Sequence, residues 1–255
     1  MIKAVILLVS LLSVLQANDF HYRKYEHVKK FYAPLAKEVV RYGMRHNIPP
    51  AAILAIAGVE SGYGRGYVAQ ITGNILSLGA GKSDKQLPAL TLLSPKNDPQ
   101  LILYDPKEIV KYQKSELVLK KHPPSLKKDY RPHPYAGTTR MLYYFKIHPR
   151  QRVKANLACV SDFCTKWISC NNPYMPFKEA RVKMDRLVQQ KGKKALLTYQ
   201  AAKEFIYSVG GRKNSFNYRP SWPKRVIAVM QHAGLVELSR DLYEGKNFQE
   251  SWSKR

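Results

Sequence analysis

Beyond residue 17 the sequence lacks any long hydrophobic run. Each later apolar stretch is broken by polar residues, proline or glycine before it reaches the roughly 20 residues that a membrane-spanning helix needs. We therefore expect a mature chain without a transmembrane domain. The chain has 255 residues, which after removal of a short leader suits one domain with a sizeable core, and we expect a monomer.

The sequence also lacks the common signatures of nucleotide and metal chemistry. It has no Walker loop, no dinucleotide-binding glycine fingerprint, no pair of histidines spaced for zinc on a helix, and no internal repeat. We therefore expect no cofactor and no metal.

Cysteine is scarce, and its three copies, Cys159, Cys164 and Cys170, fall within one short stretch. In an oxidising compartment we expect two of them to form a disulfide that closes a small loop, although the spacing does not select the pair. Zinc is the rival interpretation, but the stretch has no Cys-x-x-Cys unit and no convincing fourth ligand nearby.

Acidic residues are few: 18 Asp and Glu face 43 Lys and Arg, which gives a formal net charge of +25. A field of this sign favours an anionic polymer as partner. Nucleic acid is the usual first candidate for such a basic chain.

The first 17 residues favour a different polymer. Lys3 precedes an apolar run from Ala4 to Leu15, and Ala17 ends a small-residue cleavage pattern, which is typical of a secretory signal peptide over 1–17. The alternative is an uncleaved membrane anchor. We expect export to the periplasm or cell envelope, where the partner would be cell-wall polymer or anionic lipid and not nucleic acid. A third interpretation is that the charge is only a general property of the source's secreted proteins.

The most informative stretch, residues 49–64, predicts a helix that begins at a proline and ends at a glycine-rich turn. One face of this helix carries residues three and four apart: Ile53, Ile56, Ala57 and Glu60. Burial on that apolar face and the negative end of the helix dipole would both raise the pKa of Glu60, as a general acid requires. The alternative is an edge glutamate that reaches solvent past Ser61.

Residues 53–64 resemble the segment around the catalytic glutamate of the peptidoglycan β-N-acetylglucosaminidases of glycoside hydrolase family 73. In that family a helix ends in Glu-Ser-Gly, an aromatic residue and glycine, and an Asn-led hydrophobic segment follows, as it does here over 74–80. The resemblance implies a mainly α (α+β), lysozyme-like domain over 18–242 with Glu60 as the catalytic acid. It also implies that Ser61, Tyr63 and Asn74 bind substrate. Lytic transglycosylases likewise place Glu-Ser at a helix end.

A β-hairpin lobe over 77–106 is implied by the same resemblance. The pattern predicts strands over 90–93 and 100–104 around a turn, followed by a helix over 107–120. Family members often carry a second catalytic carboxylate in this lobe, but this hairpin contains no glutamate. Its acids are Asp84, Asp98 and Asp105. Asp105 is predicted to cap the next helix, and Asp98 is the possible second carboxylate, although its turn position also suits local hydrogen bonding.

The C-terminal third is predicted to be helical, with helices over 176–190 and 195–207 and a final helix from Pro223 to Leu235. Another helix is predicted to begin near Pro134. The loop before the final helix interleaves aromatics with cations. The resemblance implies that an aromatic residue there approaches the reacting sugar, and Tyr218 (as a catalytic residue) and Trp222 are the candidates. The tail over 243–255 is polar and is predicted to be frayed.

The leader pattern and the resemblance together imply an exported hydrolase of the β-1,4 bonds of peptidoglycan glycan strands, acting as an endo-β-N-acetylglucosaminidase. Without a hairpin glutamate, participation by the N-acetyl oxygen of the substrate is the attractive mechanism. The alternatives are a lytic transglycosylase that uses Glu60, and a non-catalytic basic wall-binding protein on the same fold.

Overall fold

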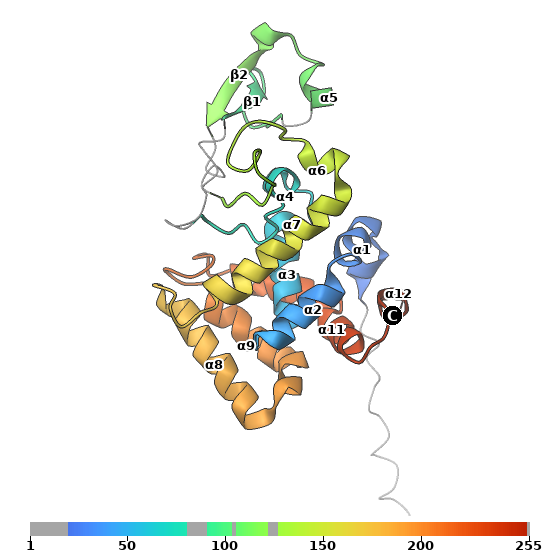
Figure 1. The fold of residues 1–255 in the computed structure, drawn as a ribbon, viewed down its shortest axis with the longest axis vertical. Helices are drawn as coiled ribbons and strands as arrows, with labels where there is room; N and C mark the ends of the chain where they lie inside the picture. Colours follow the sequence, from blue (N-terminus) through green and yellow to red (C-terminus); the bar gives the residue numbers. More distant parts are fainter. Residues whose placement is uncertain (1–19, 81–90, 104–105, 122–126, 254–255) are drawn as a thin grey trace, which may run out of the picture.

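The computed structural model describes residues 20–80, 91–103, 106–121 and 127–253. The predicted signal peptide over 1–17, Asp84 and the predicted cap Asp105 lie outside these ranges. The described part of the chain is mainly helical and contains a two-stranded antiparallel sheet at one end (Figure 1), which confirms the predicted fold class. None of its helices combines the length and apolar character that crossing a membrane requires.

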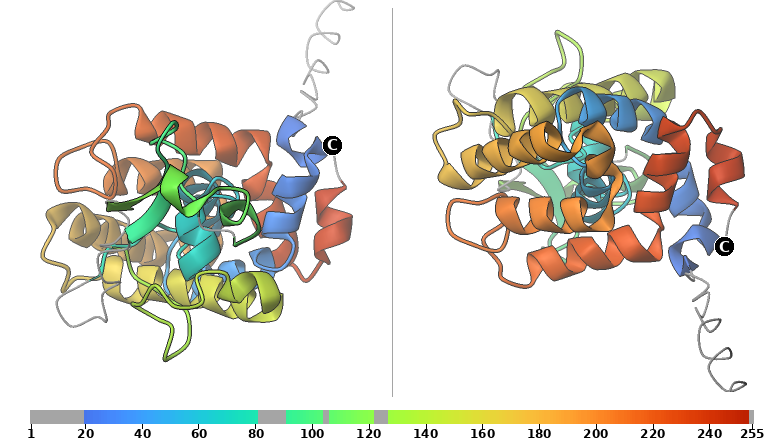
Figure 2. Two further views of the ribbon diagram at one scale, coloured as in Figure 1. Left: turned by 90° about the horizontal axis from the view of Figure 1, so that it is seen from above. Right: turned by 90° about the horizontal axis from the view of Figure 1, so that it is seen from below.

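The central element is α3 (Pro50–Ser61), which packs against α2 (Ala36–Arg45), α9 (Tyr199–Val209), α10 (Trp222–His232) and α11 (Leu235–Tyr243). Its side chains are buried on all sides from residue 50 to residue 58. The sequence predicted one buried face, but a helix that is apolar all round is stable only in the middle of a core. The predicted catalytic helix is therefore the axis of the domain (Figure 2).

Other helices enclose this core. The larger ones and their short extensions are α1 (Glu26–Tyr32), α7 (Pro149–Asp162), the π-helical turn η4 (Phe163–Trp167), α8 (Met175–Lys191) and the 3-10 turn η5 (Lys193–Leu197). The predicted helix over 176–190 is confirmed as α8. The helix predicted from 195 begins later, at α9, because Thr198 accepts a hydrogen bond from Ala201 N and caps it there.

The lobe is a sheet in which β1 (Thr91–Pro95) pairs antiparallel with β2 (Leu117–Lys121). The prediction that 100–104 supplies the second strand is wrong. That segment turns away at Asp98, and its Leu103 forms a single bridge with Leu93. A small apolar cluster built on Ile71 and Leu92 joins the lobe to α4 (Tyr67–Thr72).

The predicted helix over 107–120 is also wrong. This range contains the one-turn helix α5 (Pro106–Ile109), the 3-10 turn η2 (Lys114–Glu116) and then β2. Glu116 Oε2 accepts a hydrogen bond from Gln113 N at 2.7 Å, which closes η2 as a separate capped turn. Pairing with a strand more than twenty residues earlier overrides the local helical preference.

No helix begins near Pro134, where the prediction placed one. The chain forms turns up to α6 (Tyr144–Ile147) because a buried ion pair organises it. Asp129 and Arg131 are joined at 2.8 Å with both side chains fully buried. The Arg131 guanidinium also donates to the carbonyls of Thr138, Arg140 and Met141, so the loop wraps around it.

The C-terminal predictions need two corrections. The final helix is two helices, because the chain breaks between α10 and α11 at Gly234, whose φ is +59°. As far as residue 253 the tail is not frayed: α12 (Phe248–Trp252) buries Trp252 against Tyr32, with ring centroids 5.8 Å apart. Arg23, in the 3-10 turn η1 (His21–Lys24), donates to carbonyls of α12, so the two described ends lie side by side (Figure 1).

Candidate active site

Glu60 lies in the last turn of α3, where the buried helix meets the surface. Its side chain is partly buried, and its Oε1 accepts a hydrogen bond from Trp222 Nε1 at 2.7 Å. Trp222 is the first residue of α10 and is only 2% exposed. The resemblance made Trp222 a candidate for the loop aromatic that approaches the reacting sugar, but here it is a buried donor that fixes one oxygen of Glu60.

Gly210 allows Trp222 to reach this position. A Cβ at residue 210 would lie 2.1 Å from Cε3 and Cζ3 of the indole, so any side chain there would force the ring to move. On its other side the indole packs against Phe216, with ring centroids 5.6 Å apart. The loop between α9 and α10 therefore sets the orientation of the Glu60 carboxyl.

Opposing influences act on the Glu60 proton. Burial raises the pKa of Glu60 above its ordinary value, whereas the Trp222 hydrogen bond and the charges of Lys127 and Arg225 lower it. Burial is the largest of these effects, so the carboxyl holds its proton to a higher pH than an exposed glutamate does. The indole and the two cations would stabilise the carboxylate once the proton has left.

Lys127 is placed by the base of the lobe. It forms an antiparallel bridge with Gly79, and the next residue, Lys128, donates from its backbone N to Leu78 O at 2.9 Å. The Lys127 ammonium donates to Ser77 O at 2.6 Å, and burial lowers the pKa of this lysine while Glu60 raises it. The two chain segments that lead into and out of the lobe thus bring a partly buried cation to Glu60.

The turn after Glu60 has three successive residues in the left-handed region, with φ values of +55° for Gly62, +56° for Tyr63 and +72° for Gly64. Ser61 holds this turn, because its hydroxyl donates to Ala57 O and accepts from Gly64 N. Ser61 is 2% exposed. Its predicted role in substrate binding is therefore corrected to a structural one.

Asn74 is likewise buried, at 1% exposure. Its amide donates to the carbonyls of Leu78 and Lys128, and its oxygen accepts from Leu78 N, each at 2.9 Å. These bonds tie together the two segments that position Lys127. Asn74 therefore stabilises the segments that position Lys127, and its side chain is not exposed to substrate, contrary to the prediction.

Two predicted residues show no link to Glu60 in the described structure. Tyr218 is 70% exposed in the loop before α10 and has no hydrogen bond or ring contact among the described residues, so its catalytic role stays a prediction. Asp98 is exposed, and its carboxylate accepts from the backbone of Gln100 and Leu101 within the lobe turn. The charges that act on Glu60 come from Lys127 and Arg225. The Asp98 carboxylate instead stabilises the turn in which it lies.

The disulfide prediction is not met. Cys159, Cys164 and Cys170 are all free thiols. Cys159 is buried in α7, where its thiol donates to Asn74 Oδ1 at 3.3 Å, and burial raises its pKa to about 12. Cys164 is buried five residues further on, whereas Cys170 is exposed. Among the described residues no cluster of His, Cys, Asp or Glu could hold a metal ion.

Sequence reasoning missed Lys127, Arg225 and Gly210. One local signal exists for Arg225, which follows Trp222 by three residues and so shares its helical face. Lys127 and Gly210 have no local signal, since their roles depend on contacts between distant segments.

Comparison with known proteins yields no relative for this chain: no protein-family model matches it, and neither curated proteins nor solved structures provide a match.

Proposed function

We propose that this chain is a glycoside hydrolase that cleaves β-1,4 bonds in peptidoglycan glycan strands, with Glu60 as the general acid. The observation that carries the proposal is the partly buried Glu60 carboxyl, whose pKa is raised by burial and whose Oε1 is held by Trp222. The resemblance of residues 53–64 to family 73 glucosaminidases supports the same role and suggests a lysozyme-like arrangement.

The geometry suits a group that first gives and then takes a proton. Trp222 holds Oε1, which leaves Oε2 to protonate the oxygen of the departing sugar. The new carboxylate keeps the indole hydrogen bond and is attracted to Lys127 and Arg225. These interactions stabilise the ionised form, which can then accept a proton from the incoming nucleophile.

The charged groups that act on Glu60 are cations, and the described structure supplies no second carboxylate beside them. Glycosidases that use two carboxylates place them about 5 to 9.5 Å apart. Participation by the N-acetyl oxygen of the substrate would replace the second carboxylate. The same observation favours a second candidate function, a lytic transglycosylase, which would use Glu60 alone and release an anhydro end.

The formal charge of +25 suits attachment to a cell wall that carries carboxylates and phosphates. The leader pattern suggests that the protein meets this polymer after export. A non-catalytic wall-binding protein would share these two properties, so activity has to be measured directly.

The test compares wild type, Glu60→Gln and the control Glu244→Gln on purified cell wall in a gel-clearing assay. Glu244 is an exposed residue at the end of α11, so its variant makes the same chemical change on the surface. Loss of a general acid should lower hydrolysis by at least about 10²-fold in Glu60→Gln only. A folded Glu60→Gln protein with near-normal clearing would refute the assignment. Mass spectrometry of the products separates hydrolysis from transglycosylation, whose product is lighter by one water.

A further inference from the structure

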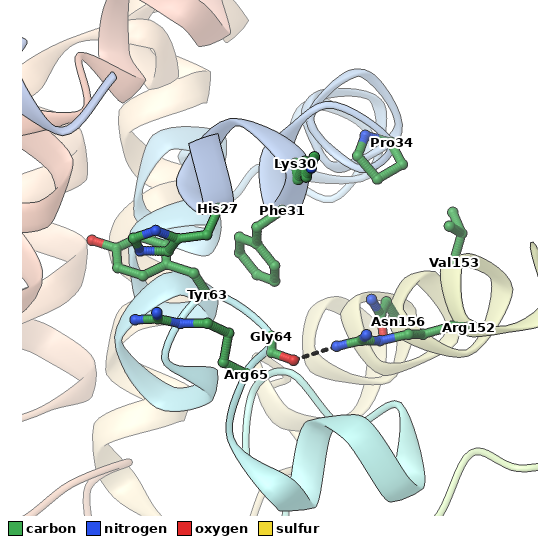
Figure 3. A pocket seen from close by; sticks show the side chains of 10 residues that line it. All are labelled: His27, Lys30, Phe31, Pro34, Tyr63, Gly64, Arg65, Arg152, Val153 and Asn156. Atoms are coloured by element: carbon green, nitrogen blue, oxygen red, sulfur yellow. Dashed lines mark hydrogen bonds between the residues drawn. The ribbon is translucent and has the colours of Figure 1, made fainter. Parts of the chain in front are cut away.

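A cavity of about 260 Å³ lies beside the turn that follows Glu60, between α1, that turn and α7 (Figure 3). Tyr63 lines it, and the Tyr63 ring covers Gly58, where an added Cβ would lie 3.2 Å from Tyr63 Cε1. Gly58 and Glu60 are two residues apart on α3, which places them roughly 200° apart around the helix. The cavity is therefore separate from the Glu60 site, although one short turn builds both.

The charge of this cavity is of one sign. Its cationic side chains are Lys30, Arg65 and Arg152, and none of the described residues that line it is acidic. Lys30 has an ion pair with Glu26 at 3.7 Å, but both side chains are mostly exposed, so this pair neutralises little. An anion that entered would meet several donors and no carboxylate.

Arg152 is already held in place. Its guanidinium donates to Gly64 O, and a Cβ at residue 64 would lie 3.0 Å from Arg152 Nη2 and 3.1 Å from Phe31 (Figure 3). Glycine at this left-handed position therefore gives the arginine and the aromatic ring their room. Arg65, one residue further on, also lines the cavity; it is exposed, and its Nε donates to Gly62 O at 3.4 Å. Arginine forks suit planar anions such as carboxylates.

Much of the remaining wall is apolar, although Asn156 also lines it. Tyr63 packs edge-on against Phe31, with centroids 6.2 Å apart, and against His27, with centroids 5.7 Å apart. Pro34 and Val153 complete this part of the lining. Such a surface suits a ligand whose anion is attached to a small apolar group, whereas a hydrated inorganic ion would make no use of it.

We propose that this cavity binds the terminal carboxylate of a short peptide with small apolar side chains. The identification of that peptide rests on the proposed function, because peptidoglycan carries such peptides along its glycan strands. The site would then grip the peptide part of the wall while Glu60, on the other side of α3, acts on the sugar.

The test measures binding by isothermal titration calorimetry with the full chain and two probes, N-acetyl-alanyl-alanine and its C-terminal amide. The free acid should bind at least about tenfold more tightly than the amide, since bonds to a charged group are among the stronger hydrogen bonds. Arg65→Ala should weaken binding of the acid at least about tenfold as well. Arg65 is exposed, so this variant should fold.

The matched control is Arg41→Ala, which removes an exposed arginine of α2 with the same change in net charge and should leave binding unchanged. Equal binding of acid and amide, or an Arg65→Ala protein that binds as wild type does, would overturn the proposal. So would inorganic phosphate that binds more tightly than the peptide. The titrations do not depend on hydrolysis and are repeated with the Glu60→Gln protein. Peptide binding can therefore be confirmed even if the proposed activity is refuted, and the activity can be confirmed even if peptide binding is refuted.

Discussion

Replacing Trp222 by Phe should move the pH dependence of wall hydrolysis to higher pH. The change keeps an aromatic ring between Gly210 and Phe216 but removes the Nε1 donor that holds Glu60 Oε1 at 2.7 Å. A hydrogen bond to a charged group contributes about 1.5–3 kcal/mol. Because this donor stabilises the carboxylate, its loss should raise the pKa of Glu60 further above its ordinary value than burial already does.

The direction of this change follows from the proposed role of Glu60 as a general acid. A general acid works only while protonated, so the rate falls as pH rises through its pKa, and a higher pKa moves this alkaline limb upward. The assay is the initial rate of cell-wall clearing across a pH series, with wild type and Trp222→Phe compared below their unfolding temperatures. The smaller ring should also cost about 1–3 kcal/mol of stability.

A control separates the two effects of the substitution. Trp167 packs against Phe177 and Phe216 in the same region, but its indole does not bond to Glu60. Trp167→Phe should therefore lower stability without moving the alkaline limb. If the limb of Trp222→Phe stays in place or moves to lower pH, the indole does not set the pKa of Glu60, and the account of the site is wrong.

Three further predictions concern stability and the support of the site. Burial raises the folded-state pKa of Glu60, so the stability that this group contributes is present below its unfolded pKa and is lost as pH rises through the folded pKa. Thermal unfolding across this pH window should show that the Glu60→Gln protein lacks this pH dependence and is more stable than wild type at neutral pH. Gly210→Ala should displace Trp222, lowering clearing activity and the melting temperature together, whereas an unchanged protein would contradict the 2.1 Å overlap. Asp129→Asn should leave the buried Arg131 charge without its ion partner, and denaturant unfolding should show a loss of about 3–5 kcal/mol; a loss below 1 kcal/mol would mean that water reaches the pair.

The sequence was sufficient to predict α3 and its carboxylate because both are local features. A proline at the start, a glycine-rich end and an unbroken run without polar residues over 51–59 define the helix without reference to the rest of the chain. The same pattern placed Glu60 where burial stops. The raised pKa follows from this position, as predicted.

The partners of Glu60 could not be predicted in the same way. Trp222 is 162 residues away in the sequence, and its role depends on a close approach that Gly210 allows. The family resemblance instead made Trp222 a candidate for the aromatic residue that approaches the reacting sugar. Lys127 looked like one more cation in a basic loop, since its charge acts on Glu60 only once Gly79 has paired with it.

The prediction of the strand pairing in the lobe failed for a related reason. Segments 90–93 and 100–104 are the nearest pair of apolar runs, and proximity in sequence favours a short hairpin. The structure pairs β1 with β2 instead, which lies beyond a second turn at η2. Local propensity cannot choose between the segment 100–104 and β2 as the partner of β1, and the turn at Asp98 is compatible with both pairings.

If Glu60 is the proposed general acid, the arrangement around it would allow one carboxylate to serve both halves of a proton-transfer cycle. Burial alone would hold the proton so firmly that the acid would be slow to release it, and the cations alone would strip it at neutral pH. In this structure the opposing groups come from different parts of the chain: α3 supplies the burial, α10 supplies the indole and Arg225, and the base of the lobe supplies Lys127. Movement of the lobe relative to α3 would change the distance from Lys127 to Glu60 and with it the pKa of the carboxyl. Lys127→Met should therefore raise that pKa, as Trp222→Phe does, and if the two groups act independently, the double variant should show the sum of the two upward shifts of the alkaline limb.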